Sequence, residues 1–160
     1  MSVSASPTEK PPMNDLRELY SEVIFDHYRA PRNRRVLAEA NRKAEGYNPL
    51  CGDKVTVYLD VQEGVIRDAS FEGVGCAIST AAASLMTDAL KGRKVGEVEA
   101  LARDFQTMAT EADASPHPEL GKLQVLAGVR EFPSRVKCAT LASHTVLAAL
   151  KGEREPISTE

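Results

Sequence analysis

The three cysteines of this chain, Cys51, Cys76 and Cys138, are the residues whose type and setting suit chemistry. An odd number of cysteines cannot form a complete set of internal disulfides, so free thiols remain for packing, metal binding or reaction. Cys51 belongs to a Cys-Gly-Asp segment with Asp53, directly before a run that alternates apolar and polar residues like a half-buried strand. Side chains two residues apart on extended backbone face the same way, so this thiol and this carboxylate can reach one ion.

The other two cysteines are predicted to open helices. Cys76 precedes a stripe of apolar residues at helical spacing, and Cys138 follows Pro133 ahead of another such stripe. A helix start carries about half a positive charge and unpaired N–H groups, which favour a thiolate and lower its pKa. Gly52 and Gly75 stand beside two of these thiols and leave backbone space next to the sulfur.

Three sulfurs and one carboxylate oxygen are a suitable donor set for a closed tetrahedral zinc site. The chain offers this set as Cys51, Asp53, Cys76 and Cys138. These groups leave about two excess negative charges around a dication, which helix dipoles and Arg135 or Lys137 can partly offset. The spacings match no tight Cys-x-x-Cys pair, so from the residues alone a shared metal or reactive site and simple burial of small apolar thiols both stay open.

Hydrophobic periodicity predicts an α+β fold, in which helices pack on one face of a small antiparallel sheet of about three strands. Alternation predicts a hairpin whose strands cover residues 55–61 and 66–73, and a third pairing segment lies within 42–47. Helical spacing predicts five helical segments, which cover residues 14–30, 77–91, 98–109, 120–129 and 138–151.

The bulk composition is that of a globular domain. The chain has 160 residues, 42% hydrophobic and 27% charged, and we expect one domain over 14–152 between tails at 1–13 and 153–160. A net charge of -3 gives no support to nucleic-acid binding. Because no apolar run approaches the ~20 residues of a membrane span and the first residues lack a secretory signal, the sequence predicts a cytoplasmic protein without membrane contact.

Several segments together resemble the iron-sulfur cluster assembly scaffold family, the IscU and NifU N-terminal-like proteins, and specifically its zinc-containing SufU-type branch. They are "LYSEVIFDHYRAPRN" at 19–33, "NPLCGDKVTVYLDV" at 48–61, "GVGCAIS" at 73–79 and "KCATLA" at 137–142. The similarity includes all three cysteine contexts in order. Lys137 stands where the IscU-type proteins carry a histidine, which favours the SufU-type branch.

The resemblance implies that Cys51, Asp53, Cys76 and Cys138 gather at one exposed end of the domain and bind zinc, iron or an iron-sulfur cluster. It also implies a pyridoxal-phosphate cysteine desulfurase of the SufS type as sulfur donor, and downstream cluster assembly proteins as recipients. The leading interpretation is a zinc-dependent sulfurtransferase or sulfur carrier, rather than a conventional enzyme, with Cys51 as the acceptor. The alternative is a scaffold that assembles a labile cluster on the same residues, and a purely structural zinc ranks last.

The histidines and the basic segment at 29–35 receive no functional role. His144 lies six positions after Cys138, and at about 100° per residue it projects roughly 120° away from that sulfur. His27, His117 and the segment "RAPRNRR" are predicted to be solvated, and docking to an acidic face of a partner is the alternative for the basic segment.

Overall fold

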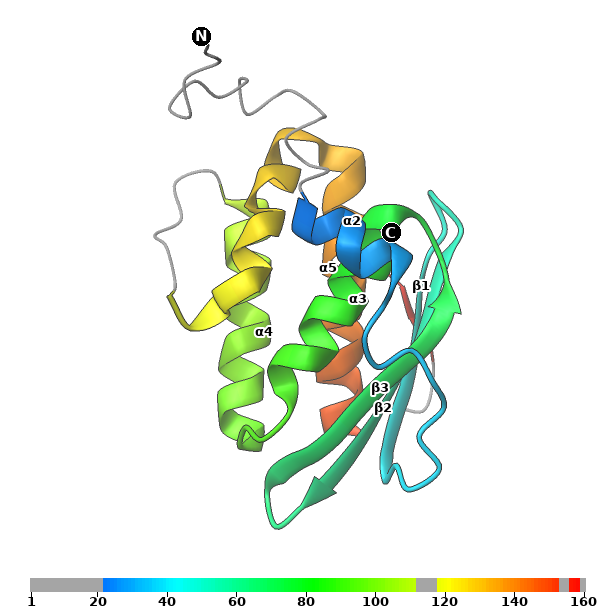
Figure 1. Cartoon of the computed structure of the whole chain (residues 1–160), viewed down its shortest axis with the longest axis vertical. Coiled ribbons are helices and arrows are strands. Elements are labelled where there is room, and N and C mark those ends of the chain that lie inside the picture. Colours follow the sequence, from blue (N-terminus) through cyan, green and yellow to red (C-terminus); the bar gives the residue numbers. More distant parts are fainter. Residues whose placement is uncertain (1–21, 112–117, 153–155, 159–160) are drawn as a thin grey trace, which may run out of the picture.

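The computed structural model describes residues 22–111, 118–152 and 156–158. Within these ranges the chain forms a four-stranded sheet with the helices on one face, which confirms the α+β class (Figure 1). Among the described residues, no helix has both the length and the apolar character needed to cross a membrane.

The sheet consists of β1 (Arg42–Asn48), β2 (Asp53–Gln62), β3 (Val65–Val74) and β4 (Ile157–Ser158), in the order β3-β2-β1-β4. The predicted hairpin and the third strand are confirmed, and these three strands pair antiparallel. The sheet has one strand more than predicted and is mixed, because β4 pairs parallel to β1. Two residues are too few to show an alternating pattern, so the sequence predicts only a tail there.

The β2–β3 hairpin has a two-residue turn. Glu63 and Gly64 have φ angles of 54° and 78°. Two consecutive positive φ values define the type I′ turn, whose twist matches that of the flanking strands. The turn fixes the pairing of Val61 with Ile66, and a register shift between Asp60 and Val61 then sets the pairing of the buried residues Val55, Val57 and Leu59.

Four α-helices and one 3₁₀ helix complete the described chain. They are α2 (Glu22–Arg29), α3 (Ala77–Leu90), α4 (Val95–Thr110), η1 (Pro118–Glu131) and α5 (Pro133–Lys151). Residues 14–21 of the first predicted helix lie outside the described residues. The predicted segment at 120–129 falls within η1, which kinks at Gly121, where φ is 54° and ψ is -127°.

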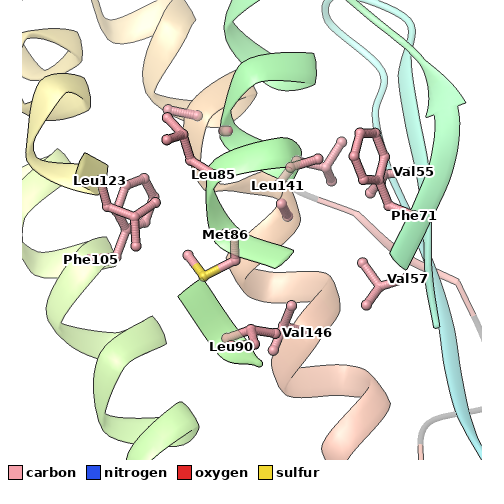
Figure 2. Close-up of a cluster of buried hydrophobic side chains, with 14 of the residues drawn as sticks. Val55, Val57, Phe71, Leu85, Met86, Leu90, Phe105, Leu123, Leu141 and Val146 are labelled. Atoms are coloured by element: carbon pink, nitrogen blue, oxygen red, sulfur yellow. The ribbon is translucent and has the colours of Figure 1, made fainter. Parts of the chain in front are cut away.

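The core lies between the sheet and the α3–α5 pair and continues to the outer helices (Figure 2). Val57 and Phe71 of the sheet face Leu141 of α5, while Met86 of α3 lies between that layer and Phe105 of α4. All five side chains are at most 3% exposed. This packing fixes α3 and α5 against the sheet, and those two helices carry Cys76 and Cys138 into the neighbourhood of Cys51.

Candidate metal centre

The three cysteines meet at one end of the sheet. Figure 1 shows the turn between β1 and β2 at the same end as the beginnings of α3 and α5. Cys51 is exposed on this turn, which is closed by a hydrogen bond from the Gly52 amide to the Asn48 carbonyl at 2.9 Å. Gly52 has a φ of 74°, a conformation that favours glycine, so the Cys-Gly-Asp sequence suits a tight turn that presents the thiol to solvent.

Asp53 begins β2 and is fully buried. Its Oδ1 accepts hydrogen bonds from the Cys76 amide at 3.0 Å and from the Ser79 hydroxyl at 3.2 Å, and its Oδ2 accepts one from Asn48 Nδ2 at 3.1 Å. A buried carboxylate is tolerated when such donors replace its water. Hydrogen bonds to the Asp53 carboxylate therefore link β2 both to β1 and to the start of α3.

Cys76 is the N-cap of α3, as predicted, and its Sγ accepts a hydrogen bond from the Ser79 amide at 3.4 Å. A hydrogen bond from the Cys138 thiol outweighs the burial of Cys76 and, together with the Ser79 amide, lowers the pKa of Cys76 to about 6. The same contact, together with burial, raises the pKa of Cys138. The two thiols titrate as a coupled pair, in which Cys138 holds its proton more firmly than Cys76 does.

Cys138 is fully buried but does not open a helix, so that prediction is wrong. Because α5 begins at Pro133, a residue well suited to the first helical position, Cys138 is the sixth residue of the helix. Its thiol contacts the Ser134 carbonyl one turn earlier at 3.7 Å. The helix-start argument for a stabilised thiolate therefore applies to Cys76 and not to Cys138.

The donor atoms lie close enough to share one ion. Ligand atoms of Cys51, Asp53 and Cys138 all lie within 4.8 Å of one another. Zinc–sulfur bonds of about 2.3 Å in a tetrahedron place two sulfurs about 3.8 Å apart, and the Cys51 and Cys138 Sγ atoms are separated by 3.5 Å. Cys76 lies outside this three-residue set but touches two of its members, through its amide on Asp53 and its sulfur on Cys138. The residues present fit a zinc ion, and the four-ligand assignment stays a prediction.

Two polar residues that were not predicted as part of the site, Asn48 and Ser79, hold this arrangement. Asn48 is fully buried, and its Nδ2 contacts Cys138 Sγ at 3.6 Å in addition to Asp53. The signal was present in the alternation of β1, which places Asn48 on the same inward face as Ala44 and Gly46. A polar residue in an apolar register requires buried partners, and here those partners are the site residues.

Gly75 has a different role from the predicted one. A Cβ atom at this position would lie 2.8 Å from Asp53 Oδ1 and would also collide with the Ser79 hydroxyl. Gly75 is therefore required for the close approach of Asp53 and Ser79, rather than to leave space beside a sulfur.

Arg135 and Lys137 lie half-buried in the first turns of α5, and their role in tuning the sulfurs stays a prediction.

The histidines lie away from the donor set or outside the described residues. His27 is 3% exposed and shares a hydrogen bond of 2.7 Å between its Nδ1 and the Ser84 hydroxyl, so the prediction that it is solvated is wrong. Its position on α2 faces α3, which covers it. His144 is exposed and contacts Gln106 at 3.3 Å, in agreement with a surface position, and His117 lies outside the described residues.

Residues 19–150 match the family described as the NifU-like N-terminal domain. The chain belongs to this family. It is similar to the "Zinc-dependent sulfurtransferase SufU" of Bacillus subtilis, with 39% identity across 80% of this chain and 86% of that protein. It is also similar to the "Iron-sulfur cluster assembly scaffold protein IscU" of Thermotoga maritima, with 38% identity across 86% of this chain and 96% of the relative.

A solved structure of the same family has the same fold. The N-terminal part of a nitrogen-fixing NifU-like protein from Brucella abortus superposes with a TM-score of 0.79 at 25% identity, and covers 86% of this chain and 95% of the other. The resemblance to the SufU and IscU branches of the NifU-like family is confirmed. The relatives are named both for zinc-dependent sulfur transfer and for cluster assembly, the two interpretations that the sequence left open.

Proposed function

We propose that this chain is a zinc-dependent sulfur acceptor and carrier in iron-sulfur cluster assembly, with Cys51 as the accepting thiol. The supporting observation is the unequal exposure of the three thiols. Cys51 is exposed on a turn, Cys76 is half-buried and Cys138 is fully buried, yet the Cys51 sulfur lies 3.5 Å from that of Cys138. A partner protein can reach Cys51, while the other two thiols remain inside.

The donor set defines the part that each residue plays. When bound, zinc would keep the coordinating sulfurs ionised at neutral pH. Cys76 accepts a hydrogen bond from the Ser79 amide, and Asn48 donates to both Cys138 and Asp53. Cys76, Cys138 and Asp53 are therefore the residues that we assign to retaining the ion. Cys51 belongs to the short turn at 49–52 and is the residue that we expect to move.

The proposed reaction is a transfer of sulfane sulfur from the persulfide of a pyridoxal-phosphate cysteine desulfurase of the SufS type. The Cys51 thiolate attacks the outer sulfur of that persulfide, and a new sulfur–sulfur bond forms on Cys51. The original sulfur–sulfur bond breaks, and its electron pair leaves with the desulfurase cysteine as a thiolate. No external oxidant or reductant is consumed. Downstream cluster assembly proteins then receive the sulfur, and we assign the process to the cytoplasm, where thiols stay reduced.

Desulfurase turnover tests this proposal with wild-type protein, zinc-stripped protein and Cys51→Ala. We expect the wild type to accelerate turnover and to carry a persulfide on Cys51, detected by peptide mass spectrometry. Cys51→Ala should fold normally, because Cys51 is exposed, but should abolish the acceleration. A persulfide found mainly on Cys76 or Cys138 would overturn the assignment.

A second candidate function, a scaffold for a labile iron-sulfur cluster, is favoured by the oxygen donor of Asp53. Thiolate ligation is usual for such clusters, so an aspartate in the set is consistent with a cluster that is easily released. The metal content of freshly purified protein separates the two candidates. One zinc ion per chain supports the carrier, and iron with acid-labile sulfide supports the scaffold.

A further inference from the structure

The amide of Asn48 makes all its described hydrogen bonds within the candidate metal centre. Asn48 ends β1, pairs in register with Asp53 of β2 and is fully buried. Its Nδ2 donates to Asp53 Oδ2 at 3.1 Å and to Cys138 Sγ at 3.6 Å, and its Oδ1 accepts from the Leu50 amide at 3.3 Å. These partners fix which end of the amide is nitrogen, since a carboxylate and a sulfur accept while an amide N–H donates.

The three cysteine sulfurs differ in the hydrogen bonds that they accept from N–H groups. Cys138 has the Asn48 side-chain amide, and Cys76 has the Ser79 backbone amide at 3.4 Å. Among the residues that the structure describes, no N–H group donates to the Cys51 sulfur, whose hydrogen-bond contact is the Cys138 thiol. A hydrogen bond from an N–H group stabilises the charge on a thiolate, and a thiolate stabilised in this way is a weaker nucleophile.

We propose that Asn48 is a positioning residue that makes Cys51, and not Cys138, the sulfur acceptor. Its Nδ2 holds the Cys138 sulfur and the Asp53 carboxylate in place, while its Oδ1 holds the Leu50 amide at the base of the Cys51 turn. Of the three sulfur ligands, Cys51 is thereby the one that is held least firmly by the protein. This inference rests on the proposed transfer of sulfur to Cys51 and adds the reason for that choice.

The test compares wild type, Asn48→Ala and Asn48→Ser, with Val57→Ala as a matched control. Val57 is a fully buried residue of β2, so its truncation weakens the same sheet without touching the centre. After incubation with a SufS-type desulfurase and cysteine, we expect the share of persulfide on Cys138 to rise at least fivefold in Asn48→Ala. Asn48→Ser keeps a smaller donor and should restore part of the selectivity, and Val57→Ala should match the wild type.

A second measurement needs no desulfurase. Cobalt(II) replaces zinc, and the sulfur-to-cobalt charge-transfer absorption reports the number of bound thiolates. We expect the Asn48→Ala signal to fall by about a third, as one of three thiolates leaves, and zinc affinity to fall roughly 10–100-fold. Asn48→Leu keeps nearly the same size but lacks the donor, and should show the same spectral change if Asn48→Ala fails to fold.

The two measurements separate failure of this inference from failure of the proposed function. If the wild type acquires no persulfide on Cys51, the proposed function is wrong, and the cobalt spectra still test the contact between Asn48 and Cys138. If Cys51 accepts sulfur in the wild type and Asn48→Ala shows wild-type selectivity and a wild-type cobalt spectrum, Asn48 has no positioning role. Equal losses in Asn48→Ala and Val57→Ala would also overturn the inference.

Discussion

The Sγ atoms of Cys51 and Cys138 lie 3.5 Å apart, although 87 positions separate the two residues in the sequence. The contact exists because α5 packs against both β1 and β2, so that the turn joining these strands lies beside the second turn of the helix. An exposed thiol therefore touches a fully buried one. This difference in exposure gives chemically similar residues separate tasks.

Gly75→Ala is expected to destabilise the protein and weaken zinc binding. The added Cβ would lie 2.8 Å from Asp53 Oδ1, so the carboxylate must shift from its three donors. We expect a loss of about 1–3 kcal/mol in the free energy of unfolding, measured by urea denaturation. Gly96→Ala is the control, because Gly96 lies in the first turn of α4 with no atom within 4 Å of the added carbon. It should be neutral or raise stability by up to about 1 kcal/mol, and equal losses in both variants would contradict the steric argument.

Asp53→Asn is expected to cost stability even without metal. Three donors face the two carboxylate oxygens, from Asn48, Cys76 and Ser79, so an amide NH₂ group must point at a donor on one side or the other. A buried polar group left unsatisfied in this way costs about 1–3 kcal/mol. The free energy of unfolding of zinc-stripped protein measures this cost.

The control for this substitution is Asp60→Asn on the same strand. Asp60 is half-buried and accepts a hydrogen bond from Gln62, its neighbour two residues away, so the change should stay within about 0.5 kcal/mol. If Asp53→Asn and Asp60→Asn had the same stability, the buried donors around Asp53 would have no energetic role.

Hydrophobic periodicity was sufficient to predict the helices and strands that carry the site. The alternation of Val55, Val57 and Leu59 and the helical stripe after Cys76 both correspond to buried faces of the structure. The convergence of the cysteines was inferred from the family resemblance and not from spacing, since packing between distant segments leaves no local pattern. The structure then brought Cys51, Asp53 and Cys138 together, with Cys76 in contact.

The errors in prediction came from interactions that depend on tertiary contacts. The apolar stripe of α5 begins only after Cys138, so the apolar pattern did not indicate the first turn of the helix after Pro133. Cys138 was therefore predicted at the helix start, although it is the sixth residue of the helix. His27 was assigned to solvent because a histidine near a helix end is usually exposed, but α3 supplies the Ser84 hydroxyl and covers the ring. Asn48 was overlooked because its partners lie on other elements.

Acidification is expected to destabilise the protein through His27. Burial of the ring lowers the pKa of His27 below its ordinary value of 6.5, and the positive charges of Arg32 and of Lys122 in η1 act in the same direction. The negative charges of Asp26 and Asp88 raise the pKa of His27 but do not outweigh these effects. Because the folded pKa is the lower one, the unfolded chain binds the proton more readily. Stability is therefore complete above pH 6.5 and falls as the pH decreases below that value, by at most about 1.36 kcal/mol per pH unit.

Urea denaturation of wild type and His27→Gln between pH 7.5 and 5.5 checks this expectation. His27→Gln should flatten the pH dependence of the free energy of unfolding, because glutamine keeps a polar group near Ser84 but does not titrate. His144→Gln is measured alongside, because burial also lowers the pKa of His144 and its own contribution to the slope must be separated from that of His27. A wild-type slope that persists in His27→Gln would show that another group is responsible.

Removal of zinc is expected to loosen the centre without unfolding the domain. The buried layers around Phe71, Met86 and Phe105 supply a core that does not depend on the site (Figure 2). A ligand present at 100 times its dissociation constant contributes about 2.7 kcal/mol to stability, so chelation should lower the melting temperature while circular dichroism stays native-like.

After chelation, hydrogen exchange should quicken at the amides of Gly52, Cys76 and Ser79, which are hydrogen-bonded within the centre, and remain slow in β2 and in the middle of α5. Loss of the whole fold on chelation would instead identify the metal as a structural staple and would rank that interpretation above sulfur transfer.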